Sequence, residues 1–134
     1  MREILFRGQT RRKGEKVWMD GSPVDSNWVE GYGVCIGKGD FSVIYAGDHV
    51  EKFTVYTDTV GQFTGLTDKN GKKIFEGDIG KSIDGVFLVR WSEEKCAFVM
   101  DFYDYPKEEL YLEEMWDDAE IIGNIHDDPE LLEG

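Results

Sequence analysis

Short apolar segments separated by tight turns are the feature that most constrains how this chain can fold. Two of them, Val86–Trp91 and Cys96–Phe102, flank a charged loop at residues 92–95. Asn70-Gly71 and Asp84-Gly85 also stand between apolar stretches, and Asn-Gly is typical of a type I′ hairpin turn, because both residues tolerate positive φ. The pattern predicts a mainly β fold made of hairpins, with residues 86–102 forming a core hairpin.

The two β parts that we expect differ in regularity. Residues 1–58 carry glycines at positions 31, 33, 37 and 39 within strand-like segments, which favours bulges and sharp bends over long strands. Residues 59–134 contain the regular hairpin series. We therefore expect an irregular N-terminal β part at 1–58 and a small barrel at 59–134 that ends in an acidic segment. Two small barrels, or one barrel with an irregular β extension, would both fit.

One short helix is possible near residues 106–116. Pro106 suits a first helical position, and Leu112, Met115 and Trp116 would then lie on one side. A helix would also bring like charges together at i and i+4, for example Glu109 with Glu113, at a total cost of about 1 kcal/mol. The sequence therefore permits this helix but also weighs against it.

The negative charge is concentrated in the last two-fifths of the chain. Among 134 residues, 28 acidic groups outnumber 15 basic ones, giving a net charge of −13. Residues 1–81 hold 12 of each sign, whereas residues 82–134 hold 3 basic and 16 acidic groups. Nucleic-acid binding is largely neutralisation of phosphates by Lys and Arg, so this balance argues against it. No apolar run approaches the roughly 20 residues of a membrane span, and no signal peptide is evident, so we expect a cytoplasmic protein.

The residue types needed for catalysis or metal binding do not form a motif. The only histidines, His49 and His126, have adjacent carboxylates but no set of ligands at a known spacing, and they read as polar turn residues. Cys35 and Cys96 lie in apolar stretches, where we expect buried, reduced thiols. No nucleophile elbow or phosphate-binding glycine loop is present. We expect no enzymatic activity, no cofactor and no metal.

The one argument for the alternative function, nucleic-acid binding, is a basic loop near the N-terminus. Five positive charges fall within ten residues, beside Phe6 and Trp18: Arg7, Arg11, Arg12, Lys13 and Lys16. Small barrels can bind nucleic acid through aromatic grooves. The overall charge opposes such binding, and a solvated hairpin loop explains the same residues.

Several blocks of sequence, in order, resemble the YopX family. They are Phe6-Arg7-Gly8, Val17-Trp18-Met19-Asp20-Gly21, the long block from Thr59 to Ile79, Val89-Arg90-Trp91, and the closing block from Ile121 to Leu131. The resemblance covers nearly the whole chain and is weakest between Asn27 and Asp58. It implies a small phage or prophage protein whose C-terminal part is similar to an SH3-like barrel. The family offers no activity and no catalytic residues to transfer.

An acidic block rich in aromatic residues is the best candidate for a binding site. The residues we expect to contact a partner are Glu108, Glu109, Tyr111, Glu113, Glu114, Trp116, Asp117 and Asp118. Carboxylates around aromatic side chains suit a basic protein surface, of a host or phage protein or of a second copy of the chain. The alternative is a solvated amphipathic segment with its aromatics turned inward. We therefore expect a protein-binding module, with nucleic-acid binding and self-assembly as competing hypotheses.

Overall fold

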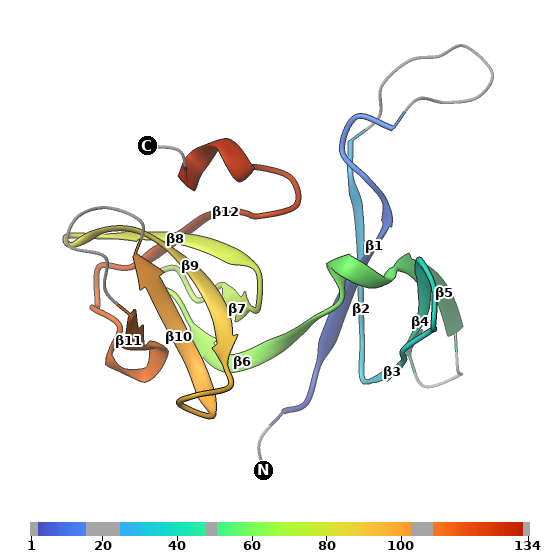
Figure 1. Cartoon of the computed structure of the whole chain (residues 1–134), viewed down its shortest axis with the longest axis horizontal. Helices are drawn as coiled ribbons and strands as arrows, with labels where there is room; N and C mark the ends of the chain where they lie inside the picture. The colour runs from blue at the N-terminus through green and yellow to red at the C-terminus, as the bar shows by residue number, and fades with distance from the viewer. Residues whose placement is uncertain (1–2, 16–24, 48–50, 103–108, 133–134) are drawn as a thin grey trace. The chain divides into compact units, whose positions relative to one another are not determined.

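The computed structural model describes residues 3–15, 25–47, 51–102 and 109–132. They form a mainly β, barrel-like fold, as the sequence predicted (Figure 1). The SH3-like relationship of residues 59–134 stays a prediction. The expected strand at Val17–Met19 lies outside the described residues. Contacts divide the chain into two compact units, Met1–Gln62 and Phe63–Gly134, whereas the sequence suggested a boundary at residue 58.

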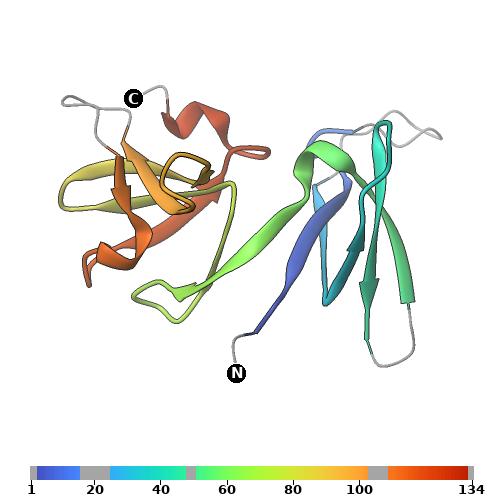
Figure 2. The same ribbon diagram turned by 60° about the horizontal axis from the view of Figure 1, so that its bottom comes forward.

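The N-terminal unit holds two groups of antiparallel strands (Figure 2). Its elements are β1 (Phe6–Arg11), β2 (Asn27–Gly31), β3 (Gly33–Cys35), β4 (Phe41–Ala46), β5 (Glu51–Tyr56), the 3-10 turn η1 (Thr57–Thr59) and the first residues of β6 (Gly61–Thr67). Strand β1 pairs with β2 and with the start of β6, while β4 pairs with β3 and β5. A Cβ on Gly31 would lie 2.1 Å from the Tyr45 carbonyl oxygen. Only glycine therefore fits at the point where β2 leads into β3.

A five-stranded antiparallel sheet dominates the C-terminal unit, in the order β11-β10-β9-β8-β12. The elements from the boundary onward are the rest of β6, β7 (Lys73–Phe75), β8 (Asp78–Ser82), β9 (Gly85–Ser92), β10 (Ala97–Phe102), β11 (Glu109–Tyr111), η2 (Leu112–Glu114), β12 (Glu120–Asn124) and η3 (Pro129–Leu132). Ala97 pairs with Ser92 and Phe102 with Phe87, so the predicted core hairpin is confirmed. The core gathers side chains from strands and loops: Ile74, Phe87, Val89, Met100, Phe102, Leu112, Ala119 and Ile121.

The possible helix near 106–116 is realised only as one 3-10 turn, Leu112–Glu114, and residues 109–111 inside its range form a strand. In a strand the acidic side chains do not have the i,i+4 spacing of a helix, so their like charges are not brought together. Residues 103–108 lie outside the described part.

Two further expectations were wrong. Of Asn70 and Gly71, only Gly71 has positive φ (+78°), so this turn is not type I′. Instead the Gly71 amide donates to the Asp68 carbonyl oxygen at 3.0 Å. Cys35 and Cys96 are exposed rather than buried. Cys96 lies in the β9–β10 turn with φ of +51°, one residue before the strand in which the sequence placed it.

Candidate functional site

The tip of the β8–β9 hairpin presents an aliphatic side chain to solvent. Ser82 pairs with Gly85, which leaves Ile83 and Asp84 as the two turn residues. Ile83 is 81% exposed, the largest fraction among the exposed large apolar residues of the described chain. The Asp84 amide donates to Ser82 Oγ at 3.2 Å and fixes the turn. The hairpin therefore displays Ile83 in a defined position.

Trp116 is held at the surface beside this tip. It follows η2 in a segment whose Leu112 and Ala119 are buried in the core, and its own side chain is 48% exposed. The indole Nε1–H donates to Asp84 Oδ2 at 2.5 Å, and the Trp116 carbonyl oxygen accepts from the Ala119 amide at 3.0 Å. An indole whose polar edge is hydrogen-bonded keeps its apolar faces available for a partner.

Four of the predicted carboxylates surround Trp116 in sequence and are exposed: Glu113, Glu114, Asp117 and Asp118. Within the part of the chain that the structure describes, none of the four makes an ion pair. Their charges are therefore uncompensated by nearby cations of the described chain. We call these four residues together with Trp116 the acidic face.

Two other predicted residues lie elsewhere. The Glu109 carboxylate accepts a hydrogen bond from Arg90 Nη2 and lies 3.5 Å from Lys95 Nζ, while Arg90 Nε is 3.0 Å from Asp101 Oδ2. Tyr111 is exposed on β11, with Lys95 Nζ 5.4 Å from its ring centroid. Both residues thus belong to a mixed-charge cluster at β9–β11. Glu108 lies outside the described residues.

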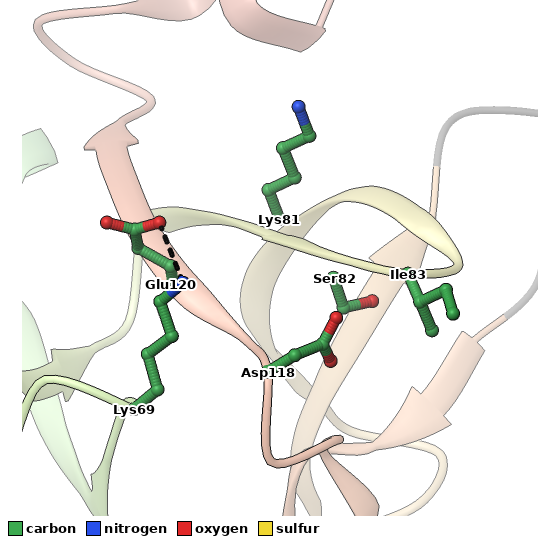
Figure 3. Close-up of a pocket in the computed structure, with 6 residues that line it drawn as sticks. All are labelled: Lys69, Lys81, Ser82, Ile83, Asp118 and Glu120. Atoms are coloured by element: carbon green, nitrogen blue, oxygen red, sulfur yellow. Dashed lines mark ion pairs between the residues drawn. The ribbon is translucent and has the colours of Figure 1, made fainter.

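A shallow hollow of about 320 Å³ adjoins the acidic face (Figure 3). Its lining comes from three separate segments: Lys69, Lys81, Ser82, Ile83, Asp118 and Glu120. Lys69 Nζ and Glu120 Oε2 form an ion pair at 3.4 Å. In Figure 3 Lys81 extends away from the other side chains, whereas the Asp118 carboxylate lies on the same side as Ser82 and Ile83. The hollow thus has one aliphatic side chain, Ile83, and one carboxylate, Asp118, that forms no ion pair with a described residue.

The buried carboxylate of Asp68 holds the frame of this hollow together. Its Oδ2 accepts from the Ile121 amide at 2.9 Å, and its Oδ1 accepts from the amides of Asn70 and Lys72. Burial alone would raise the pKa of Asp68, but these three hydrogen bonds outweigh it and hold the pKa below its ordinary value. The Lys69 amide also donates to the Ala119 carbonyl oxygen at 3.0 Å. Hydrogen bonds therefore hold the 68–72 turn against the segment that leads into β12.

Two cations of the basic loop make contacts within the N-terminal unit. Arg12 makes two hydrogen bonds to the Asp58 carboxylate, at 2.9 and 3.2 Å, and its guanidinium lies 4.0 Å from the Tyr56 ring centroid. Arg7 is buried, with its guanidinium 4.7 Å from the Trp28 ring centroid. Lys16 lies outside the described residues. Two of the five predicted cations are thus used within the fold.

Sequence reasoning missed the residues that complete this surface, Ile83 and Asp84 above all. The sequence predicted the turn at Asp84-Gly85, with Ile83 in the apolar stretch before it. The structure instead pairs Ser82 with Gly85, so the turn lies one residue earlier and Ile83 is at its tip. The described residues contain no group of three or more His, Cys, Asp or Glu side chains arranged to hold a metal ion. Among the helical segments described, none has the length and apolar character that crossing a membrane requires.

Comparison with protein families gives one match. The model of the family described as YopX protein matches residues 25–133, which is most of the chain. The match spans the acidic face, the β8–β9 tip and the 68–72 turn. No curated protein matches the chain significantly.

Proposed function

The chain belongs to the YopX family, and on that premise we propose that it is a phage or prophage protein acting as a non-enzymatic protein-binding module in the host cytoplasm. Its partner is a host or phage protein with a basic surface. The acidic face and the β8–β9 tip form the contact.

The observation that carries this proposal is the position of Trp116. A partly exposed indole, hydrogen-bonded through its edge to Asp84 and flanked in the sequence by four exposed carboxylates, has the composition of an interface anchor with a charged rim. Covering about 100 Å² of the indole would contribute about 2–3 kcal/mol to binding. The surrounding carboxylates would accelerate association with a basic partner and make binding sensitive to salt.

Nucleic-acid binding through the basic loop receives less support. Arg12 is neutralised by Asp58, and Arg7 is buried against Trp28. Self-assembly, in which the basic loop of one copy meets the acidic face of another, would draw on the same loop. We therefore place the partner outside the chain.

A pull-down from phage-infected bacterial cells, with identification by mass spectrometry, tests the proposal. The tagged chain should capture a basic protein that elutes at high salt, and Asp117→Lys/Asp118→Lys should abolish the capture. Glu93→Lys/Glu94→Lys is the matched control, since it reverses the same charge at two exposed residues in the turn at the other end of β9. Recovery of the chain alone, or equal losses from both double variants, would contradict the proposal.

A further inference from the structure

We propose that the hollow beside Ile83 receives an arginine side chain of the basic partner. This inference rests on the proposed function and specifies its contact chemistry. The aliphatic stem of the arginine would lie along Ile83, its guanidinium would pair with the Asp118 carboxylate, and Ser82 would border the site.

The lining of the hollow supports a long cationic side chain. Arg and Lys bury their methylene stems on apolar surface while the charged head stays near water or a carboxylate. Ile83 offers the apolar wall, being 81% exposed and thus uncovered by the described chain. Asp118 offers the carboxylate, and it makes no ion pair with any described residue. One side chain fits a hollow of about 320 Å³, whereas a folded element does not.

The two lysines of the lining do not cancel this preference. Lys69 is paired with Glu120 at 3.4 Å, so these two charges neutralise each other. Lys81 extends away from Asp118 and leaves the carboxylate side of the hollow open (Figure 3). Lys81 still contributes a positive charge to the lining, so the preference for a cation rests on direct contact with Asp118.

Arginine fits better than lysine because of the geometry of its head group. Its planar guanidinium donates two parallel hydrogen bonds to one carboxylate, whereas an ammonium acts as a point charge. A lysine in the same place would keep the charge and lose the paired hydrogen bonds to Asp118.

Selection from a displayed library of random peptides, with the full-length chain as bait, tests the inference. The selected peptides should be enriched in arginine over lysine. For one selected peptide, labelled and measured by fluorescence polarisation, replacement of the key arginine by citrulline should weaken binding about tenfold or more. Lysine in its place should give an intermediate loss.

Variants of the chain assign the contact to the hollow. Asp118→Asn should weaken the same peptide about tenfold, whereas the adjacent exposed Asp117→Asn should change binding less than about twofold. Ile83→Ser should also weaken it, and Ile36→Ser is the control, an equally drastic change at an exposed isoleucine of the N-terminal unit. Circular dichroism of each variant verifies the fold.

The outcomes separate this inference from the proposed function. Equal effects of Asp117→Asn and Asp118→Asn, or peptides without arginine enrichment, overturn the arginine site. The proposed function still stands in that case if the pull-down captures a basic partner through the acidic face. Arginine peptides that depend on Asp118, together with a pull-down that recovers no partner, support the site and refute the host partner.

Discussion

The basic loop of the N-terminal unit and the acidic face of the C-terminal unit carry opposite charges, and the fold uses them differently. The N-terminal unit has 8 basic and 9 acidic residues, and its Arg12 is paired with Asp58. The C-terminal unit has 7 basic and 19 acidic residues, too few cations to pair with every carboxylate. Glu109 is paired, but Glu113, Glu114, Asp117 and Asp118 are exposed. The comparison teaches that a charged segment becomes a candidate surface only when the fold leaves its charges uncompensated.

The interiors of the two units differ in their apolar part. The C-terminal unit has a contiguous apolar core of eight buried side chains, whereas the buried apolar side chains described in the N-terminal unit are Leu5, Ile44 and Val55. Both units also bury hydrogen-bonded polar groups. The backbone amide of Gln9 donates to Thr59 Oγ1 at 2.8 Å in one unit, and the Asp68 carboxylate accepts from the Ile121 amide at 2.9 Å in the other. The size of the apolar core, rather than the presence of buried hydrogen bonds, therefore distinguishes the two interiors.

The largest effect should come from breaking the apolar core of the C-terminal unit. Phe87 is fully buried, and its ring centroid lies 5.4 Å from that of Phe102. Phe87→Ala should lower the free energy of unfolding by about 3–5 kcal/mol, measured by urea denaturation. Phe41→Ala, the same change at an exposed ring, should cost less than about 1 kcal/mol. Similar losses from both variants would argue against a packed core around Phe87.

Removing the charge of Asp68 should have the second largest effect. Asp68→Asn replaces one accepting oxygen of a carboxylate that receives three backbone amides, and it should cost about 1.5–3 kcal/mol at neutral pH. Because the folded-state pKa of Asp68 lies below its unfolded value, its contribution to stability is complete above the unfolded pKa of about 4 and is lost as the pH falls through the folded one.

Urea denaturation between neutral pH and pH values below 4 tests this dependence. The difference in stability between the native chain and Asp68→Asn should shrink as the pH falls. Asp117→Asn, at an exposed carboxyl outside any described ion pair, should leave the profile nearly unchanged. A constant difference at all pH values would mean that Asp68 does not titrate with a lowered pKa.

Local patterns in the sequence predicted the hairpins well. Residues 87–92 pair with residues 97–102, close to the predicted bounds, because two apolar runs on either side of a short charged loop favour a hairpin. The Asn70-Gly71 turn was assigned the wrong type because the Asn-Gly pair was considered without Asp68, whose carbonyl and carboxylate oxygens accept from the backbone amides of residues 70–72. Asp68 accepts from the amide of Ile121, 53 positions away, and no local pattern reveals that contact.

The candidate site was predicted in part for the same reason. Composition located the acidic segment, and the structure places Trp116 and four of its carboxylates at the surface. Whether a carboxylate is compensated depends on which cations the sheet brings near it. In the sheet, Arg90 on β9 lies opposite Val99 on β10, and Glu109 on β11 lies opposite Asp101 on β10. This register brings Arg90 close enough to donate a hydrogen bond to the Glu109 carboxylate across β10. Asp84 reaches Trp116 from 32 positions away, which sequence spacing does not indicate.

A smaller effect, on proton binding, should follow from a change at Glu15. The Tyr56 hydroxyl donates to Glu15 Oε1, and this hydrogen bond, with burial and the adjacent negative charge, raises the pKa of Tyr56. Glu15→Gln should lower that pKa towards its ordinary value of about 10. Ultraviolet titration, with Tyr56→Phe to identify the signal, measures it. Glu30→Gln should leave the Tyr56 transition in place, and a transition unaltered by Glu15→Gln would show that Glu15 is not the partner.

The smallest effect should come from Arg12, and it tests the opening comparison most directly. Its ion pair with Asp58 is exposed, so Arg12→Ala should cost about 0.2–1 kcal/mol, less at high salt. Arg11→Ala, at an arginine in no described ion pair, should cost less still. If Asp58 is the true partner of Arg12, then Arg12→Ala, Asp58→Asn and the double variant should show a favourable coupling in urea denaturation. Absence of coupling would mean that Asp58 does not compensate the charge of Arg12. The basic loop would then become a candidate binding surface again. In the comparison of the two units, a charge of either sign is available to a partner when no nearby opposite charge compensates it.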